Sequence, residues 1–167
     1  ELHWHATAAE WAYMLSGHAR ITVIDPEGGT EVVDFNPGDV WYFPRGFGHS
    51  IQAMGDGCHF ILVFDNGYFS EFGTFSITDW VAHTPPEVLT KNLGLAPGEM
   101  VHFPKEEAYI VKGPVPGPLA DALPAGLKRT KLTHRFELEK AKPLFEGPGG
   151  SVRLVSQKEF PVSTTMA

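Results

Sequence analysis

Glycine and proline divide this chain into short apolar segments, and this division limits the possible folds more than any other feature. The 167 residues include 18 glycines and 14 prolines, with turn sequences such as DPEGG (25–29) and NPGD (36–39). Short apolar runs bounded by such turns are typical of β-barrels and sandwiches, whereas helix bundles need longer periodic runs. We therefore predict an all-β fold. Strands are expected at residues 2–5, 10–16, 19–25, 30–35, 40–43, 48–53 and 58–64.

The middle of the chain interrupts this pattern. In TPPEVLTKNLG (84–94), Thr84 is expected to cap a short helix that begins with two prolines and ends at Gly94. A second helical turn is expected at 97–101, and the Pro/Gly-rich segment 111–126 predicts a connection with little regular structure. Further strands are then expected in THRFELE (133–139), SVRLVS (151–156) and FPVSTTMA (160–167).

Composition excludes several classes of function. The net charge of −7 and the lack of a basic run argue against a nucleic-acid partner, because phosphate binding needs clustered Lys and Arg. No apolar stretch is long enough to span a bilayer, so no membrane partner is expected. The single Cys58 can form neither an internal disulfide nor a cysteine zinc site, and it leaves the compartment open.

Four potential metal ligands are spaced so that strands could bring them together. His3 and His5 point to the same face of a strand, because side chains alternate along it, and Glu10 follows after a gap that allows a turn. His49 begins a new strand after the turn at 44–46. A single such histidine is more often a hydrogen-bonded core or surface residue, but the joint spacing favours one site. Three imidazoles and a carboxylate suit Mn, Fe, Ni or Zn and leave two octahedral positions open.

The patterns H-x-H-x4-E-x6-G (3–17) and G-x5-P-x-G-x2-H (38–49) resemble the two motifs of the cupin superfamily. This resemblance implies a cupin fold, a double-stranded β-helix or jelly-roll barrel. It also implies that His3, His5, Glu10 and His49 bind one metal ion. Ala53 stands where many cupins have Asn, which affects no ligand.

Three longer segments resemble one family of cupins in particular. They are similar to the N-terminal cupin domain of the bicupin oxalate decarboxylases: ELHWH (1–5), GDVWYFPRGFGHSIQA (38–53) and FDNGYFSEFGTFSITDWVAHTP (64–85). It implies manganese-dependent conversion of oxalate to formate and carbon dioxide, with dioxygen as co-reactant. The chain is then expected to be a fragment that lacks the first strands of its barrel and the arginine before Glu1. Its regions would be a barrel, a helical excursion with a linker, and strands leading into a second cupin domain, at 1–83, 84–130 and 131–167.

Within this resemblance, the segment 70–74 corresponds to a mobile lid over the metal. Glu71 matches the acid/base residue, Ser70 its neighbour and Thr74 the residue that orients the closed lid; Tyr109 matches a tyrosine near the substrate. A Ser-Glu pair in a loop is otherwise an ordinary exposed feature. The remaining histidines fit no ligand spacing and are expected to be structural or surface residues: His18, His59, His83, His102 and His134.

Two other functions stay open at this point. An oxalate oxidase would share the metal and substrate but deliver no proton, and it would produce carbon dioxide and hydrogen peroxide. A non-catalytic cupin would bind a metal or sugar only, since fold does not determine function. Bacterial relatives are intracellular and fungal ones secreted, so the compartment is not predicted.

The helical excursion predicts assembly. Residues 84–101 carry an apolar set that a monomer would not leave in water: Val88, Leu89, Leu93, Leu95 and Met100. The resemblance implies a homo-oligomer, a hexamer in the intact protein. Packing of the excursion against its own barrel is the alternative.

Overall fold

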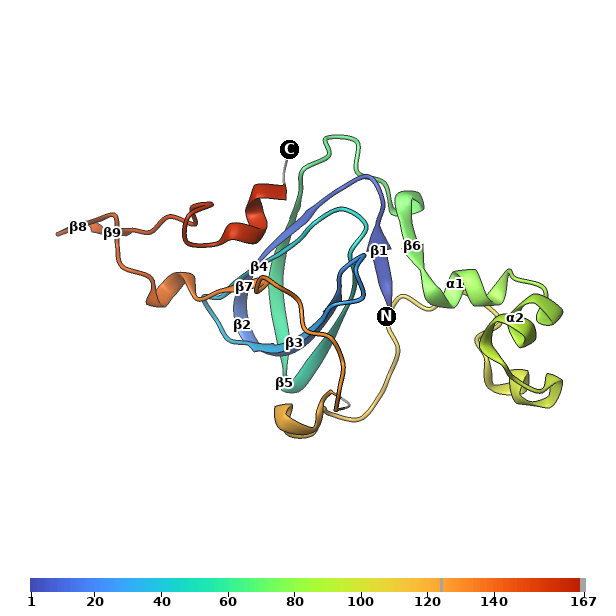
Figure 1. Ribbon diagram of the computed structural model, residues 1–167. Helices are drawn as coiled ribbons and strands as arrows, with labels where there is room; N and C mark the ends of the chain where they lie inside the picture. Colours follow the sequence, from blue (N-terminus) through green and yellow to red (C-terminus); the bar gives the residue numbers. More distant parts are fainter. Residues whose placement is uncertain (124, 166–167) are drawn as a thin grey trace.

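A computed structural model of the chain describes residues 1–123 and 125–165. Antiparallel strands wrap around a common core, and short helices lie to one side (Figure 1), which confirms the all-β prediction. The main sheet has seven strands: β1 (His3–His5), β2 (Glu10–Ile24), β3 (Thr30–Phe35), β4 (Val40–Phe43), β5 (Gly48–Phe64), β6 (Thr74–Ser76) and β7 (Arg135–Phe136).

The strand order is β6-β1-β5-β2-β4-β7, with β3 paired to β2. Since β6 and β7 end this order and form no pair with each other in the described residues, the barrel is not closed. The long strands β2 and β5 pair along most of their length and hold the sheet together.

Each of these two long strands was expected as two shorter ones. The structure instead keeps them continuous through β-bulges between Met14 and Ser16 and between Gly17 and Ala19. Gly17 has φ 70°, and a Cβ there would lie 2.1 Å from the Gly57 carbonyl oxygen. The missing side chain of Gly17 therefore lets β2 and β5 approach closely here, and β2 continues through this position without a turn.

The core lies on the inner face of the sheet. Ala19, Ile21 and Val23 alternate inward from β2, are fully buried, and pack with Phe35 and Trp41. Alternation with period 2 places Arg20 on the outer face, where its guanidinium donates to Asp34 (2.7 and 3.0 Å) and to the Gly117 carbonyl (2.7 Å). This buried arginine fastens the segment after the helices to the barrel.

The helices differ in part from the prediction. A helix that was not expected, α1 (Ile77–Ala82), begins at Ser76, whose hydroxyl accepts from the Asp79 amide. The expected helix is α2 (Pro86–Leu93), and Gly94 ends it in the left-handed conformation as predicted. Thr84 does not cap it, because the Thr84 hydroxyl donates to the Trp80 carbonyl (2.6 Å) and Pro85 takes the cap position.

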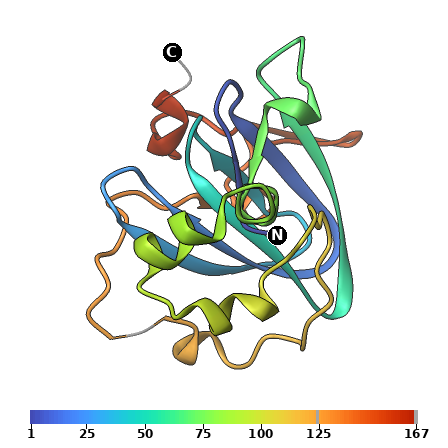
Figure 2. The same cartoon turned by 90° about the vertical axis from the view of Figure 1, so that its right-hand side faces the viewer.

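The expected second helical turn is the 3₁₀ helix Pro97–His102. It lies beside α2 on the same side of the molecule (Figure 2). A single 3₁₀ turn, Leu119–Asp121, interrupts the Pro/Gly-rich connection, in agreement with the prediction of little regular structure.

The C-terminal segments are less regular than expected. In 133–139 only β7 is a strand, followed by the 3₁₀ turn Leu138–Lys140, and β8 (Phe145–Gly147) pairs with β9 (Gly150–Val152) in a hairpin that projects from the barrel (Figure 1).

The strand predicted at 160–167 is wrong over its described part. Pro161–Thr165 is a 3₁₀ helix, in which the Phe160 carbonyl accepts from the amide and the hydroxyl of Ser163. Phe160 and Val162 are buried against Tyr42 and Ala9. Residues 166 and 167 of the prediction lie outside the described residues. Among the helices of the described chain, none combines the length and apolar character needed to cross a membrane.

Candidate metal centre

Strand register brings the histidines together. β1 lies between β5 and β6, and His3 is paired with His49 of β5 on one side and with Ser76 of β6 on the other. His5 lies two residues along the same face of β1. Glu10 begins β2 directly opposite Phe43 of β4 and Phe64 of β5, so that its side chain enters from the adjoining wall.

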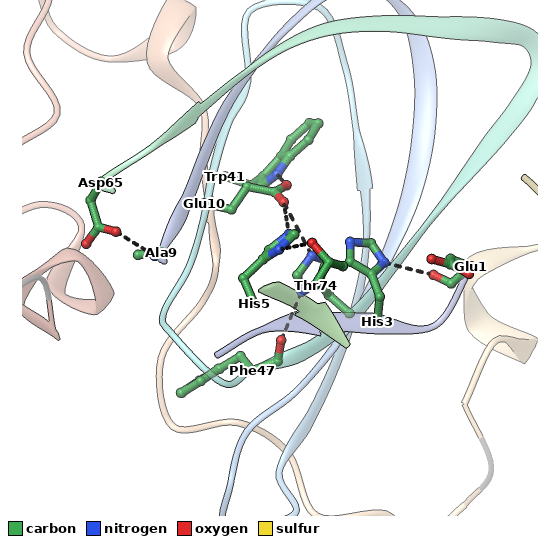
Figure 3. Close-up of polar contacts among 10 residues, drawn as sticks. Glu1, His3, His5, Ala9, Glu10, Trp41, Phe47, Asp65 and Thr74 are labelled. Carbon is green, nitrogen blue, oxygen red and sulfur yellow. Dashed lines mark hydrogen bonds and ion pairs between the residues drawn. The ribbon is translucent and has the colours of Figure 1, made fainter. Parts of the chain in front are cut away.

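The four side chains form one compact cluster. One potential ligand atom from each of His3, His5, Glu10 and His49 lies within 4.8 Å of the others. His5, Glu10 and His49 are buried, and His3 is half-buried. The structure thus brings together the four residues whose spacing suggested a site. Figure 3 labels three of them, His3, His5 and Glu10.

Each imidazole is held by a partner at its Nδ1 atom. His3 Nδ1 lies 3.3 Å from the Glu1 carbonyl oxygen, and His49 Nδ1 lies 2.9 Å from the Phe47 carbonyl oxygen. His5 Nδ1 lies 3.0 Å from the Thr74 hydroxyl (Figure 3). A carbonyl oxygen can only accept, so Nδ1 of His3 and of His49 carries the proton. Their Nε2 atoms are then left as the lone-pair donors that a metal requires.

Glu10 is the centre of the cluster. One carboxylate oxygen accepts from Trp41 Nε1 (3.0 Å), and the other lies 3.1 Å from His5 Nε2 and 3.4 Å from His49 Nε2. Burial raises the pKa of Glu10, but the contacts with His49, His5 and Trp41 outweigh burial and hold it well below its usual value. The carboxylate is therefore ionised under ordinary conditions, as a metal ligand must be.

The donor set fits a divalent metal ion. His49 Nε2 is buried and, among the described residues, has only its ion-pair contact with Glu10 and no hydrogen bond of good geometry. Burial, followed by the neighbouring His49, lowers the pKa of His3 to about 4, so this ring is neutral near pH 7. Neutral imidazoles around one carboxylate match the preferences of Mn, Fe, Ni and Zn.

Aromatic rings surround the cluster. Phe43 stacks on His49 with ring centroids 4.3 Å apart, and Phe64 and Phe69 stack on each other at 3.7 Å. Both of the latter rings meet His5 edge to face, at 5.0 and 5.5 Å. The walls of the site are thus apolar, and they limit the access of water to any ligand bound there.

The expected lid segment, residues 70–74, lies at the rim of this site. Ser70 accepts from the Phe72 amide (3.3 Å) and starts the 3₁₀ turn Glu71–Gly73. Glu71 is exposed, and Phe72 beside it is fully exposed. Thr74 contacts His5, so the segment is joined directly to the cluster. The structure does not bring Glu71 to the four ligands.

Tyr109 lies outside the cluster on the surface. Its side chain is 55% exposed, and a hydrogen bond with Glu107 raises the pKa of its hydroxyl. The negative charges of Glu71 and Glu1 raise this pKa further.

Sequence reasoning missed three groups that hold the ligands: Trp41 and the carbonyls of Glu1 and Phe47. Trp41 lies among four consecutive buried residues in β4, so no alternation marks it as inward-facing. Backbone carbonyls leave no signal in the side chains at all.

The histidines expected to be structural or on the surface have different environments. His18 and His83 are exposed and pair with Asp56 and Asp79, and His59 and His102 are exposed. His134, in contrast, is 2% exposed and pairs with Glu31 at 2.8 Å. It is thus a core residue of this barrel.

Comparisons with known proteins agree with this geometry. Over its whole length the chain is 45% identical to oxalate decarboxylase OxdC of Bacillus subtilis and covers 43% of that protein. It is 32% identical to a probable oxalate decarboxylase of Arthroderma benhamiae and covers 41% of it. The chain therefore spans less than half the length of these relatives.

Solved structures give the same result. The B. subtilis oxalate decarboxylase at pH 4.6 matches with a TM-score of 0.91 and 43% identity, over 98% of this chain and 42% of that chain. Another structure, from work on the Mn(II) centres of the same enzyme, also has a TM-score of 0.91 and 43% identity, over 98% of this chain and 43% of that one. Residues 1–100 match the Cupin family. The family match and the shared fold agree: the chain belongs to the cupin family.

Proposed function

We propose that the intact protein containing this chain converts oxalate to formate and carbon dioxide. One manganese ion would be held by His3, His5, Glu10 and His49, and dioxygen would serve as co-reactant. The observation that carries the proposal is the contact between Thr74 and His5, because it joins the Ser-Glu segment to a four-ligand cluster. The names of the relatives, all of them oxalate decarboxylases, support the choice of substrate.

The reaction explains why a redox metal and an acid/base are needed together. Heterolysis of oxalate would leave a poor carbanion on a carboxylate carbon. Manganese would supply the one-electron chemistry that weakens the carbon–carbon bond, which zinc could not do.

Proton transfer must be carried out by the chain's own residues. We assign to Glu71 the removal of the proton from mono-protonated oxalate, and its return to the one-carbon fragment after carbon dioxide departs. The sum is hydrogen oxalate to formate plus carbon dioxide, with no proton gained or lost.

Glu71 is exposed in the described conformation, so it must move inward to act. The segment 70–73 is short, mostly exposed and held at its C-terminal end by Thr74. Closure would bring the carboxylate over the cluster, beside the apolar walls of Phe64 and Phe69. Exclusion of water and of excess dioxygen would protect the one-carbon fragment from oxidation to a second carbon dioxide.

The test is Glu71→Gln in the intact protein. This variant keeps the size and hydrogen bonding of the side chain but removes the acid, so formate production should fall roughly 100-fold to 10,000-fold. Manganese content should not change. Glu87→Gln, on the exposed face of α2, is the matched control and should keep full activity.

Formate and peroxide are measured together. Unchanged formate production in Glu71→Gln, at normal metal content, would show that another group carries the proton. A wild-type protein that releases peroxide in place of formate would be an oxalate oxidase, and the decarboxylase proposal would be wrong.

We also propose that the helical excursion mediates assembly into a homo-oligomer, a hexamer in the intact protein. Val88 and Leu93 are 43% and 53% exposed on α2, and Trp80 of α1 is 54% exposed. The excursion thus leaves apolar surface uncovered in a single chain, and a second copy would remove it from water.

A further inference from the structure

A buried ion pair lies on the inner face of the barrel, in the same cross-strand row as a proposed metal ligand. His49 of β5 is paired with Val23 of β2, and Val23 is paired with Glu31 of β3. Directly paired residues place their side chains on the same face of a sheet. Val23 is fully buried in the core, so Glu31 also faces inward, two strands away from His49.

His134 completes this pair from a distant part of the chain. The Glu31 carboxylate accepts from the His134 amide (2.8 Å), lies 2.8 Å from His134 Nδ1, and accepts from the Thr133 hydroxyl (2.7 Å). The carbonyl of His134 in turn accepts from the Tyr42 amide of β4 (3.2 Å). Strand β3 and the segment just before β7, 103 residues apart in the chain, are thereby joined.

The His134 ring faces the residues that support His49. Its centroid lies 5.6 Å from that of Phe47 and 6.4 Å from that of Phe43. Phe47 provides the carbonyl that holds His49 Nδ1, and Phe43 stacks on the His49 ring. Any displacement of His134 therefore acts on both groups that orient this ligand.

The strand next to His134 supports a second ligand. β7 lies beside β4 (Figure 1). In this pair Arg135 is opposite Trp41, and Trp41 donates to Glu10. Arg135 is also fixed, because its guanidinium bonds the buried Asp39 at 2.7 and 2.8 Å. Residues 133–136 thus lie next to the residues that contact Glu10 and His49, namely Trp41, Phe43 and Phe47.

We propose that His134 is a positioning residue for the metal centre, which acts on His49 through Phe43 and Phe47 and is held in place by Glu31. The proposal rests on the metal site of the proposed function but not on its reaction. It makes residues 133–136 part of the metal-binding unit, although they follow the last ligand by more than 80 residues.

Stability alone is a poor explanation for a histidine at this position. His134 Nε2 is buried and has no hydrogen-bond partner in the described part of the chain. A buried polar atom without a partner is unfavourable, and a well-packed apolar side chain would avoid that cost. An apolar residue, however, could not form the side-chain hydrogen bond with Glu31.

Two variants separate the effect of the hydrogen bond between His134 and Glu31 from the effect of the His134 ring. His134→Phe keeps a ring against Phe43 and Phe47 but loses the bond to Glu31, whereas His134→Asn keeps a donor near the Nδ1 position and loses the ring. Glu31→Gln, the conservative change, keeps one acceptor oxygen for the His134 amide and ring, and its NH2 group can donate to the Thr133 hydroxyl in place of the lost acceptor. Each is made in the intact protein and titrated with Mn²⁺ alone, in the absence of oxalate.

His134→Phe is expected to weaken Mn²⁺ binding about 10-fold, at the lower end for groups that orient metal ligands. The zero-field splitting of bound Mn²⁺ in its EPR spectrum should change with it, and Glu31→Gln should be nearer to wild type in both. Arg20→Met is the control, because it removes the ion pair of the buried Arg20 with the partly exposed Asp34 from the outer face of the same sheet. It should lower stability and leave Mn²⁺ affinity and the EPR spectrum unchanged.

Folded His134→Phe and His134→Asn proteins with wild-type affinity and EPR spectrum would overturn the proposal. An equal loss of affinity in Arg20→Met would do the same, since the effect would then follow stability alone. If one His134 variant does not fold, the other and Glu31→Gln decide.

A wild-type protein that binds no Mn²⁺ would refute the proposed function separately. The inference would then be decided by the imidazole nitrogen shifts of His49 in the metal-free protein. A change of these shifts in the His134 variants supports it, and identical shifts overturn it.

Discussion

Trp41→Phe tests whether the single N–H bond to Glu10 controls the metal centre. Trp41 Nε1 donates to a Glu10 carboxylate oxygen at 3.0 Å, and both side chains are fully buried. Phenylalanine keeps a ring in the same space but has no donor. The carboxylate then loses its hydrogen bond from Trp41 and retains only its contacts with the two histidines.

The cost to stability has two parts. A hydrogen bond to a charged group contributes about 1.5–3 kcal/mol. The change from Trp to Phe also removes roughly 40 Å³ of side chain, which at about 24 cal/mol per Å³ adds about 1 kcal/mol. We expect a loss of about 2.5–4 kcal/mol in the free energy of unfolding of the metal-free protein.

The effect on the metal follows from the pKa of Glu10. Burial raises this pKa, and the contacts with His49, His5 and Trp41 together lower it well below the usual value. A carboxylate of this kind contributes stability above its unfolded pKa, and the contribution is lost as pH falls through the folded value. Removal of one lowering contact raises the folded pKa, so protons displace the metal at a higher pH than in wild type.

The assay is Mn²⁺ affinity as a function of pH, together with urea denaturation of the metal-free protein. Affinity near pH 7 should fall about 10-fold to 100-fold, as for other groups that hold metal ligands. Phe60→Leu is the control, because Phe60 packs against Trp41 with ring centroids 5.1 Å apart and contacts no ligand in the described structure. If Trp41→Phe and Phe60→Leu lose metal at the same pH, the hydrogen bond does not set the pKa of Glu10.

Three further outcomes are expected. His49→Ala should remove bound manganese and activity together, and full metal occupancy by elemental analysis would contradict its assignment as a ligand. Arg20→Met should lower the free energy of unfolding by about 2–3 kcal/mol, less than the loss of a fully buried ion pair, because Asp34 is 35% exposed. It should also speed amide hydrogen exchange around Gly117, and exchange equal to wild type would refute the role of Arg20 in holding this segment. The intact protein should sediment as an oligomer at micromolar concentration, and a monomer would argue against assembly through the excursion.

The cluster of His3, His5, Glu10 and His49 could be predicted because its signal is local. His3 and His5 need only the alternation of a strand, and Glu10 and His49 need only a nearby turn. The all-β class followed from the same local punctuation by Gly and Pro. The helix α1 gave no such signal, because six residues are too few to show a helical period.

Features that depend on a distant partner could not be predicted. The bulge at Gly17 exists because Gly57 lies across from it, and burial of His134 depends on Glu31, 103 residues earlier. The alternating apolar residues Phe160 and Val162 suggested a strand. In the structure Val162 lies in a 3₁₀ helix and Phe160 directly precedes it. Both side chains are buried because they pack against Ala9 and Tyr42 of the barrel wall.

The partners of the imidazole Nδ1 atoms differ in how they could change during evolution or design. Two of them, at Glu1 and Phe47, are backbone carbonyls, which persist whatever side chain occupies the position. The third is the Thr74 hydroxyl, which a single codon change removes or replaces. Electron donation by the His5 imidazole can therefore be tuned by substitution at position 74, with valine, serine and asparagine as a graded series, while the contacts of His3 and His49 act as fixed references.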